Sequence, residues 1–146
     1  MKAQRISAPQ DLDAAFAIRR EVFVVGQNVP AEEEYDAHDA NGATHYLARA
    51  IDGTPCGAAR WRKTEAGVKL ERFAVLSDYR NQQAGAALLE QVLQDVDAQY
   101  PGAVVYLHAQ LPAVRFYERH GFDKVGEMFE ECDIQHYKMV RRSAKG

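Results

Sequence analysis

The chain has 146 residues, of which 47% are hydrophobic and 27% charged, and its formal net charge is −3. This composition is typical of a globular protein, and the length predicts a single domain over residues 1–146. Because the net charge is small and negative, it provides no general attraction to nucleic acid or to an anionic membrane. We therefore expect neither as a partner.

The sequence gives no sign of a disulfide framework or of a membrane segment. Its two cysteines, Cys56 and Cys132, are far apart and fit neither a metal-ligand pair nor a disulfide pattern. Residues 1–6 lack the apolar stretch of a signal peptide, and no apolar run reaches the ~20 residues that span a bilayer. These features predict a cytoplasmic protein with reduced thiols.

The N-terminal region predicts a short strand followed by a helix. Residues 2–7 fit the strand, and Asp11 is a suitable N-cap for a helix whose apolar positions continue to Phe23. Gly26 and Pro30 bracket the end of this helix.

An acidic segment, residues 31–42, comes next and ends in the turn Asn41-Gly42. Asp36, His38 and Asp39 invite a metal interpretation, but their spacing matches no known ligand pattern. We therefore expect a solvated loop and no metal, with the alternative that its carboxylates line an acceptor site.

The rest of the chain alternates strand and helix patterns. Three strands separated by short polar turns, typical of an antiparallel meander, are expected at residues 44–51, 56–62 and 68–75. Helices are expected at 82–100 and 112–120, a buried central strand at 103–109, a final strand pair at 122–128 and 134–140, and a frayed basic tail at 141–146. This order predicts a mixed α/β sheet with helices on its faces.

The junction between the third strand and the first long helix predicts a phosphate site. Small residues crowd the helix start at Ala84–Ala87, and Arg80 lies just ahead of it. A helix N-terminus with little side-chain bulk leaves its free N–H groups accessible, and its dipole favours negative charge.

Two segments make the chain resemble the GNAT superfamily of N-acyltransferases. Arg80-Asn-Gln-Gln-Ala-Gly85 is similar to the family turn Arg/Gln-x-x-Gly-x-Gly/Ala, except that Gln83 replaces the first glycine. Phe116-Tyr-Glu-Arg-His-Gly-Phe122 is similar to the family's Tyr-x-x-x-Gly-Phe helix end. Residues 18–30, 107–110 and 134–136 further resemble the ElaA-like or YjcF-like branch. The resemblance implies a mostly antiparallel central sheet flanked by helices on both faces.

The same resemblance implies acetyl-CoA as the acyl donor. The implied cofactor-binding residues are Phe73, Ala74, Val75, Arg80, Asn81, Gln82, Gln83, Ala84, Gly85, Ala86, Gln110 and Phe116. In this set the strand backbone pairs with the pantetheine arm, the turn receives the diphosphate, and Gln110 offers an amide to the pantetheine. The alternative is that Phe73 and Val75 are only core residues.

Acyl transfer needs an acid for the leaving thiolate and a base for the attacking amine. Tyr117 is the candidate acid, because a phenol can protonate a thiolate; the alternative is a packed core tyrosine. Glu71, His108 and His136 are candidate bases. Glu71 could instead form ion pairs on a solvated face, and each histidine could be structural.

The acceptor is expected to be a small-molecule or peptide amine. Its candidate contacts are Arg19, Gln27, Tyr35 and His136. Since neither matched motif contains cysteine, direct transfer in a ternary complex is expected, with a non-catalytic acyl-CoA-binding module as the alternative. The last strand pair could also pair across a homodimer.

Overall fold

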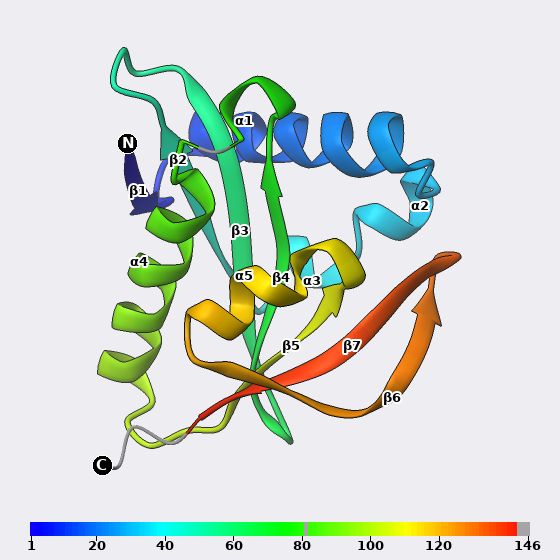
Figure 1. The fold of residues 1–146 in the computed structure, drawn as a ribbon. Helices are drawn as coiled ribbons and strands as arrows, with labels where there is room; N and C mark the ends of the chain where they lie inside the picture. The colour runs from blue at the N-terminus through cyan, green and yellow to red at the C-terminus, as the bar shows by residue number, and fades with distance from the viewer. Residues whose placement is uncertain (81, 143–146) are drawn as a thin grey trace.

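The computed structural model describes residues 1–80 and 82–142, and within them seven strands form one sheet (Figure 1). The strands are β1 (Lys2–Arg5), β2 (Ala43–Arg49), β3 (Pro55–Thr64), β4 (Gly67–Val75), β5 (Val105–Gln110), β6 (Phe122–Glu131) and β7 (Ile134–Arg141). Their order is β1-β2-β3-β4-β5-β7-β6, and every neighbouring pair is antiparallel except β4 and β5. The mixed, mostly antiparallel sheet predicted from the sequence is confirmed.

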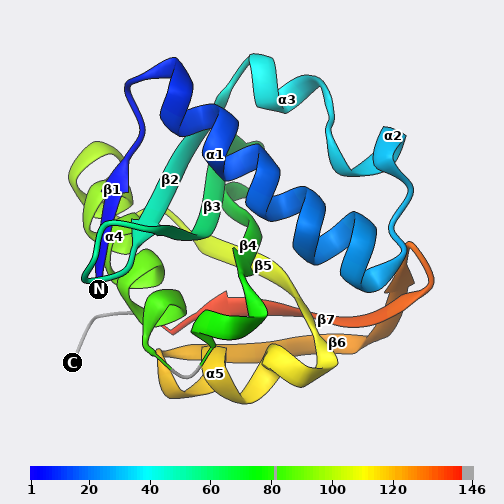
Figure 2. The same cartoon turned by 90° about the horizontal axis from the view of Figure 1, so that it is seen from above.

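Helices cover both faces of this sheet. They are α1 (Pro9–Arg19), which continues as a wider π-helical segment (Arg20–Val25), α2 (Ala31–Glu34), α3 (Ala37–Ala40), α4 (Ala84–Gln99) and α5 (Val114–Arg119), with single 3₁₀ turns at Ser77–Tyr79 and Leu111–Ala113. Seen from above, α1 lies on one face while α4 and α5 lie on the other (Figure 2).

Each face has its own apolar core, as the alternation of side chains along a strand requires. On β2, Tyr46 packs with α4 residues such as Leu88 and Val92, whereas Leu47 packs with Ala15 and neighbouring residues of α1. The apolar residues of α1 and of α4 are therefore buried against opposite faces of one sheet.

The expected cap of the first helix is wrong. The helix begins at Pro9 with Ala8 as the N-cap, and Ala8 makes no side-chain cap hydrogen bond. Proline favours the first helical position because its φ is already helical and its missing N–H is not needed there. Asp11 lies inside the first turn, where its carboxylate accepts a hydrogen bond from Arg49 at 2.7 Å.

The acidic segment is not a solvated loop. It forms the short helices α2 and α3, and it buries the carboxylates of Glu34 and Asp39. The side chain of Asp36 caps α3 by accepting from the His38 amide, and Asn41-Gly42 forms the expected turn.

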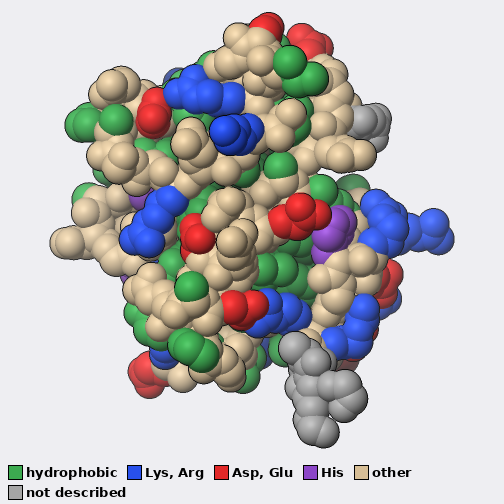
Figure 3. Space-filling view, turned by 90° about the vertical axis from the view of Figure 1, so that its left-hand side faces the viewer, with side chains coloured by type: hydrophobic (Ala, Val, Ile, Leu, Met, Phe, Trp, Pro, Cys, Tyr) green, Lys and Arg blue, Asp and Glu red, His purple; other side chains and the backbone are tan. Residues whose placement is uncertain are grey.

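The C-terminal end is ordered further than expected. Arg141 belongs to β7, and the amide of Arg142 donates to the carbonyl of Gly121 at 2.8 Å. Residues 143–146 of the expected tail lie outside the described residues. No helix in the described part of the chain is long and apolar enough to cross a membrane. On the face formed by α4 and β1, acidic and basic side chains are interspersed rather than gathered by sign (Figure 3).

The two parallel strands separate part-way along their length. β4 pairs with β5 only from Val68 to Leu70, which lie opposite Val105 to Leu107. Beyond this point Arg72 has a left-handed backbone (φ +56°), and the register between β4 and β3 shifts. Such an irregularity bends a strand and opens space beside it.

Candidate active site

A cleft of about 720 Å³ lies where β4 and β5 separate. This volume is in the range of small-molecule sites. Its walls come from β4, β5, α5, the end of the first helix, α2 and the β6–β7 turn. Predicted site residues that line it are Gln27, Glu71, Phe73, Ala74, Val75, Arg80, Gly85, His108, Gln110, Phe116, Tyr117 and His136.

The other predicted site residues lie elsewhere. Gln82, Gln83, Ala84 and Ala86 stand at the start of α4 but not in the cleft lining, and Asn81 lies outside the described residues. Arg19 is buried in an ion-pair cluster, and half-exposed Tyr35 packs its ring edge-on against Phe16, with the ring centroids 5.2 Å apart. The structure therefore does not bring Arg19 or Tyr35 to the cleft wall.

One side of the cleft offers a free strand edge. Ala74 and Val75 pair with β3 on their other side, but the register with β5 has already ended at Leu70. Within the described residues, the edge of Phe73–Val75 that faces β5 thus has no strand partner. An extended chain can add to such an edge by backbone hydrogen bonds.

The free edge of β4 leads to the N-terminus of α4, and two arginines lie nearby. Arg80 is exposed and donates through Nε to the carbonyl of Val75 at 3.1 Å, which holds the guanidinium beside the cleft. Arg119, at the end of α5, also lines the cleft and was not anticipated from the sequence. At Gly85, an added Cβ would lie 3.4 Å from the Phe116 ring, so the glycine allows α4 to start close to α5.

Gln83 has the backbone conformation that a glycine would adopt. It precedes α4 with φ +70° and ψ +16°, its side chain makes no cap hydrogen bond, and it is exposed. Its carbonyl accepts the first helical hydrogen bond, from the amide of Ala87 at 2.9 Å. Because the side chain is absent from the cleft lining, the replacement of the motif glycine leaves the cleft open.

Tyr117 presents a buried phenol to the cleft. Its ring is 7% exposed and packs edge-on against Phe73 and Phe122, with centroids 6.3 and 5.8 Å away. No hydrogen bond to its hydroxyl is found among the described residues, and no fully buried side-chain oxygen in them lacks a partner, so the hydroxyl is open to the cleft. Burial raises the pKa of Tyr117, so the hydroxyl stays protonated at neutral pH.

Gln27 and Gln110 join opposite walls of the cleft. Their side-chain amides donate to each other, with N···O distances of 3.2 and 2.9 Å. The pair connects the end of the first helix to the end of β5. A residue predicted for the acceptor, Gln27, is thus bound to one predicted for the cofactor, Gln110.

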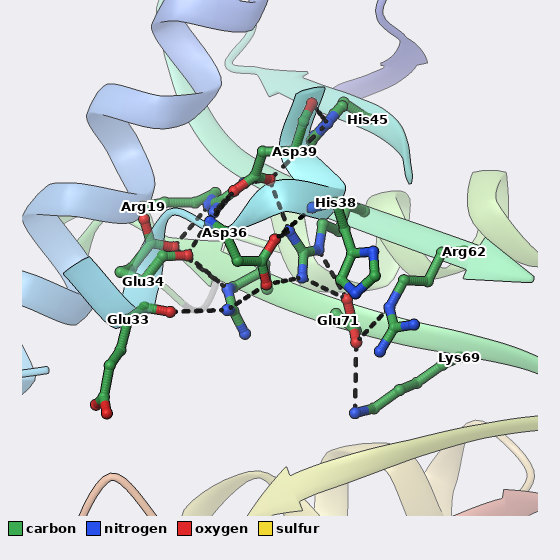
Figure 4. A network of polar contacts seen from close by, with 12 residues as sticks. Arg19, Glu33, Glu34, Asp36, His38, Asp39, His45, Arg62, Lys69 and Glu71 are labelled. Carbon is green, nitrogen blue, oxygen red and sulfur yellow. Dashed lines mark hydrogen bonds and ion pairs between the residues drawn. The ribbon is translucent and has the colours of Figure 1, made fainter. Parts of the chain in front are cut away.

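Glu71 is a buried carboxylate surrounded by cations (Figure 4). One oxygen accepts from Arg60 Nε at 2.8 Å, and the other accepts from Arg62 Nε at 3.0 Å and lies 3.4 Å from Lys69 Nζ. Burial alone would raise the pKa of Glu71, but Arg60, Lys69 and Arg62 together hold it below its ordinary value. Glu71 is therefore ionised, with both oxygens already engaged.

The cluster around Glu71 extends to the two short helices. Arg19 Nε donates to Glu34 at 2.7 Å, and both Arg19 and Arg60 donate to Asp39, at 2.6 and 2.7 Å. Arg60 also binds Asp36 at 2.8 Å. The carboxylates of the acidic segment thus fix α2 and α3 to α1 and β3, which explains why the segment is folded.

A second polar group, unnoticed as a unit in the sequence, lies near the β6–β7 turn. Glu131 accepts a hydrogen bond from His108 Nδ1 at 2.9 Å, and its other oxygen is 3.8 Å from His136 Nε2. The next residue, Cys132, donates to the Glu33 carboxylate at 3.2 Å, so the turn touches α2. Glu131 was missed because the strand before the turn was expected to end at residue 128.

The chain matches a known family over almost its whole length. The family model described as "Acetyltransferase (GNAT) domain" matches residues 8–143. The chain belongs to this family. The resemblance drawn from the turn at residues 80–85 and the helix around Tyr117 is thereby confirmed.

The chain is similar to bacterial relatives over nearly its whole length. It is 38% identical to the uncharacterized N-acetyltransferase YjcF of Bacillus subtilis, covering 97% of this chain and 99% of YjcF. The crystal structure of Escherichia coli ElaA superimposes with a TM-score of 0.86 at 31% identity, covering 97% of this chain and all of the ElaA chain. An acyl-CoA N-acyltransferase from Pseudomonas aeruginosa gives a TM-score of 0.84 at 31% identity, with the same coverage.

A more distant structure shares the fold alone. It is an aminoglycoside 6′-N-acetyltransferase complexed with coenzyme A, with a TM-score of 0.73 and 17% identity, covering 97% of this chain and 96% of the other. Together the comparisons support an acetyltransferase and bear out the predicted ElaA-like or YjcF-like branch.

Proposed function

We propose that the protein transfers an acetyl group from acetyl-CoA to a primary amine, in one step within a ternary complex. The observation that carries the proposal is one cleft that joins a free strand edge at Phe73–Val75, a cationic helix start at Arg80 and a buried phenol at Tyr117. Membership of the acetyltransferase family supports it, as does the coenzyme A held by the aminoglycoside 6′-N-acetyltransferase of the same fold.

Two parts of acetyl-CoA, the pantetheine arm and the diphosphate, have chemically suitable counterparts in the cleft. The pantetheine arm would extend along the backbone of Phe73–Val75, where its amides complete the strand edge. The diphosphate would lie at the start of α4, near Arg80 and Arg119, where helix N–H groups and guanidinium groups favour anions.

The reaction follows from these positions. The amine nitrogen attacks the thioester carbonyl carbon, the carbon–sulfur bond breaks, and the departing sulfur takes the proton of the Tyr117 hydroxyl. A base removes a proton from the amine nitrogen. The cysteines do not enter this scheme: Cys56 is buried in the core, and direct attack requires no acyl-enzyme.

The acceptor side of the cleft favours a cationic amine. Glu34 and Glu71 are neutralised by arginines, whereas Glu33 and Glu131 are carboxylates at the exposed mouth, on either side of Cys132. Carboxylates at the rim raise the local concentration of an ammonium ion. We therefore place the acceptor between α2 and the β6–β7 turn.

The test is a panel of primary amines and short peptides, assayed for release of CoA from acetyl-CoA. We expect turnover with at least one cationic amine and formation of its N-acetyl product, identified by mass. In parallel, acetyl-CoA should raise the melting temperature, because a ligand that binds only the native state stabilises it. A rise in melting temperature without turnover on any amine would contradict the catalytic proposal and indicate an acyl-CoA-binding module instead.

A further inference from the structure

The polar group near the β6–β7 turn has the geometry of a base held by a carboxylate. His108, Glu131 and His136 all line the cleft on the acceptor side. We infer that His108 is the general base for the amine and that Glu131 is its positioning residue. This inference rests on the proposed function and deepens it, because it selects one base from the three candidates.

The contact between His108 and Glu131 fixes one tautomer. A carboxylate accepts hydrogen bonds but does not donate them, so the 2.9 Å contact requires hydrogen on His108 Nδ1. In the neutral ring the lone pair is then on Nε2, and no partner for Nε2 is found among residues 1–80 and 82–142. A carboxylate that holds imidazole in one tautomer also stabilises the imidazolium formed when a proton is taken up.

The other two candidate bases are less suited to take a proton from the amine. The carboxylate oxygens of Glu71 are occupied by Arg60 and Arg62. His136 Nδ1 donates to the carbonyl of Ile134 at 2.7 Å, so its lone pair is on Nε2, which faces Glu131. The His136 side chain is only 9% exposed, against 24% for His108, so His108 is the more accessible of the two imidazoles.

The sheet register places these groups on one face. His108 of β5 lies opposite Lys138 of β7, and two residues along, Gln110 lies opposite His136. Directly opposite residues in antiparallel strands point to the same side of the sheet, as do residues two apart in one strand. All four side chains therefore share the face that carries α1 and α2.

A bulge in β6 sets the position of Glu131 along that face. Val125 and Phe129 are four positions apart, whereas their partners Lys138 and His136 are two apart. Gly126, with φ +81°, absorbs the two extra residues. Phe129 consequently stacks on His136, at 5.8 Å between centroids, and meets His108 edge-on at 5.0 Å, which keeps the two imidazoles in place on either side of its ring.

Several other charges act on His108. Lys69 and Glu71 face this side of the sheet from β4, and Lys138 and His136 face it from β7. The amino group of Lys138 lies over the Tyr106 ring, 5.4 Å from its centroid, and Lys69 interacts with Glu71 and with Glu131. Because these groups remain in the Glu131 variant described next, a change in its pH profile can be assigned to Glu131.

The decisive experiment is the pH dependence of kcat/KM for the most active amine of the panel. We expect His108→Gln to lower kcat/KM by about 10²- to 10⁴-fold, the usual contribution of a general base. Glu131→Gln should lower it by about 10- to 100-fold and move its acidic limb to lower pH, because the charge that favours imidazolium is lost. The KM for acetyl-CoA should not change in either variant.

Glu130→Gln is the matched control. Glu130 is exposed on the same strand, but it lies opposite Gln135 and points to the other face, so the same change of charge should leave rate and pH profile as in the wild type. Nitrogen-15 spectra of the histidine rings give a readout independent of turnover, and they should show His108 protonated on Nδ1 when neutral.

Two results would contradict the roles given to His108 and Glu131 and leave the proposed function standing. They are a wild-type pH profile in Glu131→Gln and a neutral His108 protonated on Nε2. A wild-type protein that binds acetyl-CoA but acetylates no amine would overturn the proposed function, and the base role with it. The failures of the two proposals are therefore distinguishable.

Discussion

Gln83 holds a left-handed backbone at the entrance to α4, a conformation that costs a residue with a Cβ about 1–2 kcal/mol. We expect Gln83→Gly to raise the free energy of unfolding by about 0.5–1 kcal/mol, since the relief of strain exceeds the added freedom of the unfolded chain. Urea unfolding measures this change.

Its neighbour supplies a control of opposite sign. Gln82 is also exposed but is not among the residues with positive φ. Gln82→Gly should therefore lower the free energy of unfolding by about 0.5–1 kcal/mol, because the unfolded chain gains freedom and the hydrogen bond from the Gln82 side chain to the Asp78 carbonyl is lost. If the two substitutions change the free energy of unfolding equally, the left-handed backbone at Gln83 is not a source of strain.

Tyr117 can be tested by removing a single oxygen atom. Tyr117→Phe keeps the ring that packs against Phe73 and Phe122 and deletes the hydroxyl, for which no partner is found in the described part of the chain. We expect kcat to fall by about 10²- to 10⁴-fold while acetyl-CoA still raises the melting temperature as in the wild type. An unchanged kcat across pH 6 to 10 would mean that the thiolate leaves without this proton and that the tyrosine is only a core residue.

At the scale of elements, most of the sheet could be predicted because local patterns decide it. Apolar alternation and polar turns mark β2 to β4, and the stripe containing Leu88 and Val92 marks α4. The acidic segment could not be predicted, because the cations that neutralise it, Arg19, Arg60 and Arg72, come from distant parts of the chain. The same holds for the site: the motif around Tyr117 is local, whereas the pair of His108 and Glu131 depends on a bulge.

The helix α2 depends on these distant contacts. A four-residue helix is too short to be stable alone. Arg72 donates to the carbonyls of Glu33 and Glu34 and to Asp36, at 3.3, 3.1 and 3.2 Å. We expect Arg72→Gln to speed hydrogen exchange of the amides in residues 31–40 and to raise the KM for the amine.

Arg62→Gln is the control for this prediction. Arg62 binds Glu71 of the same cluster, and none of its described contacts is with α2 or α3. It should leave exchange in residues 31–40 as in the wild type. Equal exchange in the two variants would mean that the loss of any arginine of the cluster destabilises residues 31–40. The contacts of Arg72 with α2 would then have no special role.

For the whole molecule, the buried charges make stability depend on pH. The pKa of Asp39 is lowered: burial opposes this, but Arg19 and the amide of Asp36 outweigh it. Hydrogen bonds from Arg60 lower the pKa of Asp36, and the surrounding cations lower that of Glu71. Carboxylates with lowered folded-state pKa values contribute stability above their unfolded values, about 3.9 for Asp and 4.3 for Glu, and this stability is lost as pH falls further.

His45 makes stability depend on pH in a second range, above that of the carboxylates. It is buried beside Asp39 with Nε2 3.2 Å from the Asp39 carbonyl, and burial lowers its pKa despite that contact. Since the folded state disfavours the proton, the stability from neutral His45 is complete above the unfolded pKa of about 6.5 and is lost as pH falls toward the folded value. We expect urea midpoints to decline modestly below pH 6.5 and steeply below pH 4. In His45→Gln the decline below pH 6.5 should disappear, and the decline below pH 4 should remain. If the decline below pH 6.5 persists, another group is responsible for it.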